Sequence, residues 1–150
     1  MTTVLDEPSE LLGMVGQKLG TTQWMKVTQQ QVDMFADATG DRQWIHTDLA
    51  RAAKGPFKGT IAHGYLTLAL TPSVLAEVLE IRELTAALNY GVDRVRFPAP
   101  VRVGSQVRAV VTVTGARQKT SGVESVFTLT YEIDGQERPA CVADVIVLYP

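Results

Sequence analysis

Residues 65–80, which read YLTLALTPSVLAEVLE, decide the fold that this sequence predicts. Apolar side chains occur on almost every side of a helix drawn through this segment, so the helix is expected to be buried rather than amphipathic. Pro72 lies inside the segment and predicts a kink, because proline lacks the backbone N–H donor that a continuous helix needs. A buried helix requires a second layer of structure to cover it.

The second half of the chain predicts this layer as a β-sheet, because apolar and polar residues alternate there with the period of strands. The candidate strands are Leu88–Phe97, Gln106–Gln118, Val123–Ile133 and Pro139–Tyr149. Ser121-Gly122 marks a looser turn and Asp134-Gly135 a tight hairpin turn, which indicates antiparallel pairing. With a short strand at Gln23–Val27, the pattern predicts an α+β domain in which roughly five antiparallel strands wrap the helix. Exposed edge strands of such a sheet favour pairing with a second copy.

The first half of the chain predicts helices. Thr28 and Gln31 form a capping-box pattern, an apolar helical face follows, and Gly40 supplies the helix stop. Residues 47–54 indicate a short helix capped by Thr47. Residues 1–20 are ambiguous, since three glycines interrupt the only apolar cluster.

Length and charge narrow the class of protein. A chain of 150 residues with 45% hydrophobic content predicts one domain over residues 1–150, with residues 1–15 as a loosely ordered segment. A net charge of −2 argues against nucleic acid as a partner, which needs a basic face. The lone cysteine, Cys141, lies in an apolar strand and is expected to be a buried packing residue. No signal peptide and no membrane-spanning stretch are recognisable, so we expect a cytoplasmic protein that does not enter a membrane.

The two histidines of the chain mark the candidate site. Asp41 and His46 lie just past a helix end, and His63-Gly64 stand at the start of the buried helix. Together these stretches supply an acid, a base and a backbone N–H donor, which is a minimal set for chemistry on a carbonyl compound.

Three motifs in this order carry a resemblance to a known family: Gly40-Asp41 through Ile45-His46, Gly59 through Gly64, and Val95 through Val101. They resemble the MaoC-like dehydratases, the (R)-specific enoyl-CoA hydratases of the hot-dog fold. The nearest subgroup is that of nodulation-protein-N-like proteins and mycobacterial 3-hydroxyacyl-thioester dehydratases. The resemblance implies a long central helix wrapped by a curved antiparallel sheet, and a homodimer whose two sheets join.

The resemblance also implies a reaction in fatty acid metabolism. Asp41 and His46 would be the catalytic pair for reversible syn addition of water to a trans-2-enoyl thioester, and the Gly64 N–H would be the oxyanion donor. Which member of the pair activates water stays open. No cofactor is expected, because CoA or a phosphopantetheine arm enters as part of the substrate. The family's usual Asn-Pro is Gln43-Trp44 in this chain, which preserves an amide and replaces a rigid proline.

Further residues are candidates for substrate contacts. Those for the substrate pocket are Gln43, Trp44, His63, Tyr65, Asn89 and Tyr90. His63 is expected mainly to shape the turn into the helix. Arg94 and Arg96 are candidates for the CoA phosphates, with Arg102 and Arg108 as weaker ones. Two histidines and one cysteine suggest no metal site.

Two alternative functions stay open. A hot-dog domain can bind an acyl thioester without turning it over, and the Gln43-Trp44 change is compatible with that role. An acyl-CoA thioesterase is disfavoured, since residues 65–80 contain no acid before Glu77. The acyl chain length, and the choice between CoA and a carrier protein, do not follow from the sequence.

Overall fold

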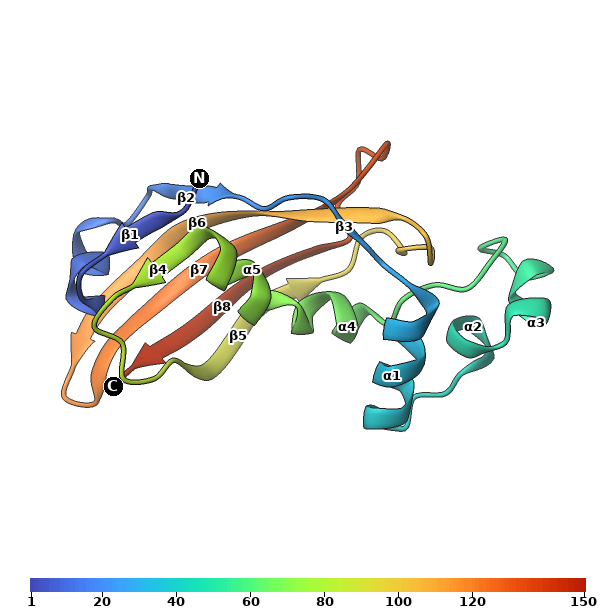
Figure 1. The fold of residues 1–150 in the computed structure, drawn as a ribbon, viewed down its shortest axis with the longest axis horizontal. Helices are drawn as coiled ribbons and strands as arrows, with labels where there is room; N and C mark the ends of the chain where they lie inside the picture. Colours follow the sequence, from blue (N-terminus) through green and yellow to red (C-terminus); the bar gives the residue numbers. More distant parts are fainter.

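A computed structural model describes residues 1–150 and contains one large antiparallel sheet (Figure 1). Its strands, in spatial order, are β2 (Lys18–Thr21), β6 (Gln106–Lys119), β7 (Gly122–Ile133), β8 (Cys141–Tyr149) and β5 (Leu88–Arg96). The two-residue strand β3 (Met25–Lys26) also pairs with β6. The predicted α+β architecture is therefore confirmed, and its four long strands lie within three residues of the expected bounds.

The predicted helix is divided into α4 (Gly64–Ala69) and α5 (Thr71–Val78). The expectation that it is buried on all sides was wrong: one face, with Thr67, Thr71, Val74 and Val78, is buried, whereas Tyr65, Ala69, Ser73 and Ala76 are exposed. Pro72 lies in the first turn of α5, where a missing N–H breaks no helical hydrogen bond, so the predicted kink is confirmed. Val74 and Val78 are at most 1% exposed and pack into the core. Burial of such a side chain stabilises the fold by about 1.5–3 kcal/mol. No helix in the structure combines the length and the apolar character needed to cross a membrane.

The expectation that this helix reaches Glu80 was wrong by two residues. Residues Leu79–Ile81 instead form β4, which pairs in parallel with β1 (Thr3–Leu5). The N-terminal segment is also better ordered than expected. After β1 it forms a 3₁₀ helix, η1 (Pro8–Gly13), and buries Leu5 and Leu11 in the main core. The apolar contacts of these two leucines hold the segment in place.

The lengths of the two turns were predicted in reverse: the turn at Ser121-Gly122 is the tight one, and the connection that contains Asp134-Gly135 is the longer one. β6 and β7 are joined by two residues only, and Lys119 pairs with Gly122 at the end of the ladder. The Asp134-Gly135 turn does form, with Gly135 at φ +75°, but residues 134–140 separate β7 from β8. The Pro139 carbonyl accepts from Ala99 outside β7 and β8, and pairing with β7 begins only where Ala140 donates to the Tyr131 carbonyl.

Three helices extend beyond the end of the sheet (Figure 1). They are α1 (Gln29–Thr39), α2 (Trp44–Thr47) and α3 (Leu49–Ala53). Thr28 and Gln31 form the predicted capping box, and Gly40 ends α1 at φ +80°. The predicted Thr47 cap was wrong, because Asp48 caps α3 while the Thr47 hydroxyl donates back to the Gln43 carbonyl. Both chain ends lie toward the opposite end of the molecule (Figure 1).

Candidate active site

The structure brings the predicted catalytic pair together. Asp41 follows the left-handed Gly40 directly, and His46 lies in α2. The His46 Nε2 and Asp41 Oδ2 atoms are 3.9 Å apart. The His46 side chain is 7% exposed and that of Asp41 is 41% exposed, so the imidazole is enclosed while the carboxylate faces the opening.

The hydrogen bonding of His46 fixes which ring nitrogen carries a proton. Its Nδ1 lies 2.6 Å from the main-chain oxygen of Ile61, and because a carbonyl only accepts, Nδ1 is the donor. In the neutral ring, Nε2 then presents a lone pair toward Asp41. Two acceptors 3.9 Å apart form no direct hydrogen bond, and a water that donates one hydrogen to each suits the gap between them.

Gln43 favours the ionised form of the Asp41 carboxylate. Its side-chain amide donates to Asp41 Oδ1 at 3.1 Å. This hydrogen bond is the main reason that the pKa of Asp41 lies below its usual value, and the main-chain N–H of Gln43 lowers it further. Gln43 therefore acts on the carboxylate rather than lining the cavity, and the amide preserved in this position forms the orienting bond expected of it.

His63 is buried beside Asp41 and His46. Its ring stacks on that of His46, with centroids 3.8 Å apart and planes inclined by 24°. Asp41, His46 and His63 each offer a ligand atom within 4.8 Å of the others. However, lone pairs of imidazoles lie in the ring plane, so two stacked rings do not converge on one ion. A shared metal would require one ring to rotate out of the stack.

Gly64 lies where a backbone donor is available. It is the first residue of α4, so its N–H has no acceptor within the helix. A Cβ at this position would lie 3.0 Å from the Phe97 ring, so only glycine fits without a shift of that ring. A cavity of about 470 Å³ opens here. It is lined by Phe35, Thr39, Asp41, His46, His63, Gly64, Tyr65 and Phe97.

The sequence matches the MaoC like domain over residues 11–135. The chain belongs to the MaoC-like family. It is 47% identical over 142 residues to 3-hydroxyacyl-thioester dehydratase Z of Mycobacterium tuberculosis, a match that covers 94% of each chain. Nodulation protein N of Rhizobium leguminosarum is 42% identical over 149 residues, which cover 97% of this chain and 90% of that protein.

Solved structures agree with this assignment. The MaoC-like chain superposes on the (R)-hydratase from A. caviae involved in PHA biosynthesis with a TM-score of 0.74 and 27% identity, over 91% of this chain and 96% of that one. The fold is therefore the hot-dog fold, as the motifs predicted. The dehydratases and hydratases among its relatives show that this MaoC-like protein is an enzyme of the hydro-lyase class.

Sequence reasoning missed three residues that line the cavity of this MaoC-like domain: Phe35, Thr39 and Phe97. Phe97 lies in the third family motif, and Phe35 lies on the apolar face of α1, so each carried a signal that was interpreted as packing. Tyr65 does line the cavity and is 70% exposed.

Other candidates lie away from the cavity of the MaoC-like domain. The Trp44 ring packs against Gly55, and the Arg51 guanidinium lies 4.3 Å from its centre, so Trp44 packs on this loop and does not line the cavity. Tyr90 is exposed on β5 beneath the Lys119 amine.

The two arginines expected at the CoA phosphates line no part of this cavity. Arg94 is paired with Asp144 on the neighbouring strand, and Arg96 donates to the carbonyl of Val95. Cys141 is fully buried, as predicted, and burial raises the pKa of its thiol to about 11.

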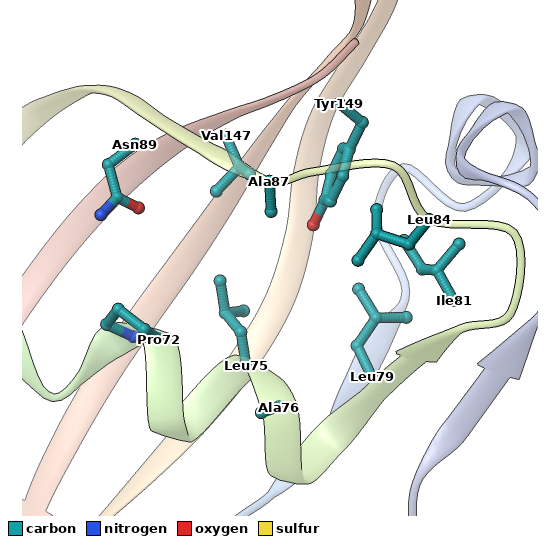
Figure 2. A pocket seen from close by; sticks show the side chains of 10 residues that line it. All are labelled: Pro72, Leu75, Ala76, Leu79, Ile81, Leu84, Ala87, Asn89, Val147 and Tyr149. Atoms are coloured by element: carbon teal, nitrogen blue, oxygen red, sulfur yellow. The ribbon is translucent and has the colours of Figure 1, made fainter.

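A second, mostly apolar cavity of about 270 Å³ lies further along α5 (Figure 2). Pro72, Leu75 and Ala76 line it from α5 (Figure 2). Ala87, in the loop before β5, and Asn89, at the start of β5, face them. Between this cavity and α4 lies another, of about 250 Å³, which shares Pro72 and Asn89 with it. Asn89, a candidate from sequence, therefore belongs to this apolar region of the MaoC-like domain.

Proposed function

We propose that this MaoC-like domain is an (R)-specific enoyl-CoA hydratase, or 3-hydroxyacyl-thioester dehydratase, that adds water reversibly to trans-2-enoyl thioesters. One observation carries the proposal: two proton acceptors, Asp41 and His46, lie 3.9 Å apart beside a cavity. The backbone donor of Gly64 lines the same cavity.

The reaction follows from these groups. A water held between Asp41 and His46 loses one proton to the pair while its oxygen bonds to C3 of the substrate. Negative charge then moves to the thioester oxygen, where the Gly64 N–H donates a hydrogen bond, and the pair returns a proton to C2 on the same face. Dehydration is the reverse. Acid–base groups of this kind contribute about 10²–10⁴-fold each, and loss of one oxyanion donor costs about 10²–10³-fold.

CoA or a phosphopantetheine arm enters this scheme only as part of the substrate, and no separate cofactor takes part. The acyl chain is proposed to run from Gly64 along α4 and α5 into the apolar cavity around Leu75. At 1.5 Å per residue, the eight residues from Gly64 to Pro72 correspond to about 12 Å of helix. A chain of several carbons therefore suits this path.

A homodimer is proposed to form through β5. This strand pairs with β8 on one side only, and it is the last strand of the sheet. Leu88, Tyr90 and Val92 on it are 48%, 59% and 48% exposed, although strand edges of monomers are usually protected by charge. A second copy that pairs along β5 would join the two sheets and cover these side chains.

The decisive experiment is hydration of crotonyl-CoA, followed by loss of its conjugated absorbance. Asp41→Asn and His46→Gln are each expected to reduce the rate by at least about 10²-fold. Asp134→Asn, which changes an exposed carboxylate in the turn after β7, is the matched control and should leave the rate unchanged. Full activity in either active-site variant would refute the assignment. Binding without turnover would indicate a thioester-binding protein, and thiol release would indicate a thioesterase.

A further inference from the structure

His63 lines the cavity and contacts both members of the pair. Its Nε2 lies 2.8 Å from the main-chain oxygen of Asp41. Its ring stacks on the His46 ring at 3.8 Å, and Phe35 packs against it at 4.9 Å between centroids. His63 is 3% exposed, so these neighbours define its environment almost completely.

The proton positions on this ring follow from its contacts. The Asp41 carbonyl can only accept, so Nε2 of His63 carries a hydrogen. Nδ1 is buried and has no hydrogen-bond partner. In this tautomer Nδ1 carries no hydrogen, so no buried donor is left without an acceptor. His46 has the opposite arrangement, with its hydrogen on Nδ1.

Gln43 orients the Asp41 carboxylate, and His63 holds the Asp41 main chain. The Asp41 N–H reaches only the Thr39 hydroxyl, at 3.4 Å, whereas its carbonyl has the shorter bond from His63. The His46 ring is tied at Nδ1 to Ile61, and the stack with His63 limits its rotation about that bond. One side chain at the start of α4 therefore contacts both groups.

We propose that His63 is a positioning residue that, as the Nε2–H tautomer, holds Asp41 through its carbonyl and His46 through ring stacking. The inference rests on the proposed function of the pair. Misplacement of catalytic groups by about 1 Å can cost about 10²-fold in rate, which sets the scale of the effect.

Two variants separate the two contacts. His63→Phe keeps an aromatic ring for stacking but has no donor for Asp41, and His63→Gln keeps a donor but has no ring. Both are expected to lower kcat by at least about 10-fold with KM changed by less than about 3-fold, because substrate binding groups remain in place. Val113→Ala, in the core far from the site, is the control for lost stability and should keep its kcat.

An effect confined to KM or to thermal stability, or a wild-type kcat in both His63 variants, would overturn the proposal. Activity lost in Asp41→Asn but retained in both His63 variants would leave the hydratase assignment intact and remove only this inference.

A second measurement needs no activity. Because the chain has two histidines, ¹⁵N spectra of the imidazoles can assign each tautomer. We expect Nε2–H for His63 and Nδ1–H for His46 in the wild-type protein. The same tautomer in both rings would contradict the proposal.

Discussion

The indole ring of Trp44 covers Gly55 so closely that a Cβ on that glycine would lie 3.0 Å from the ring. Trp44 is the first residue of α2, which carries His46, so this contact supports the catalytic loop from outside. We predict that Gly55→Ala displaces the ring, destabilises the protein by about 1–3 kcal/mol and lowers the hydration rate. Gly13→Ala, where the new methyl meets nothing, is the control. Denaturant unfolding and rate measurements check both, and equal stability of the two variants would contradict the prediction.

Gly64→Ala tests the backbone donor. The new methyl would lie 3.0 Å from the Phe97 ring, so either the ring or the start of α4 must move. We expect kcat to fall by about 10²-fold, the usual cost of a lost oxyanion donor. Gly13→Ala, where the new methyl meets nothing within 4 Å, is the control and should have little effect. A Gly64→Ala enzyme with normal kcat would exclude this N–H from the reaction.

Gln43→Ala changes the pH dependence in a defined direction. The Gln43 amide is the main cause of the lowered pKa of Asp41, so its removal raises that pKa toward the usual value. Activity that needs an ionised Asp41 is present above this pKa and is lost as pH falls through it. The acid limb of kcat/KM should therefore move to higher pH in the variant. Gln30→Ala on the exposed face of α1 should leave the profile unmoved, and an unmoved profile in Gln43→Ala would count against the argument.

Ala76→Phe tests the proposed path of the acyl chain. The phenyl ring would occupy the apolar cavity along α5, so the rate with an eight-carbon enoyl-CoA should fall by about 10-fold or more while crotonyl-CoA is little affected. Ser73→Phe adds the same ring to an exposed position of α5 outside the cavity and serves as the control. Equal losses with both substrates would mean that the chain lies elsewhere.

Val92→Lys tests pairing along β5. A charge on an exposed strand edge opposes pairing with another strand, so the variant should elute as a monomer where the wild type elutes as a dimer. Light scattering coupled to size-exclusion chromatography measures this directly. Gln136→Lys places the same charge in the exposed connection before β8 and should not change the mass. A monomeric wild-type protein would exclude the dimer altogether.

The parts of this fold that follow from local sequence were predictable. The helix within residues 65–80, the alternating strands and the Thr28 capping box each depend on residues close in the chain, and each is present in the structure, although the helix is buried on one face only. The β1–β4 pair was not predictable in the same way. It joins Thr3 to Leu79, and no local pattern of three residues indicates a partner at such a distance.

The same distinction applies to the site. Asp41 and His46 belong to one motif and were identified together, whereas the contact between Gly64 and Phe97 joins separate motifs and required the fold. Trp44 was predicted to line the pocket because it replaces a motif residue. In the structure its ring packs against Gly55 and does not line the cavity.

Both chain ends lie toward the end of the sheet opposite α1, α2 and α3 (Figure 1). A protein fused to either terminus would therefore be attached away from the catalytic loop. Linked enzymes, surface tethers or affinity tags can be added at these ends while the cavity beside Asp41 stays open to solvent. The arrangement therefore suits this enzyme to fusion with other enzymes that catalyse successive reactions.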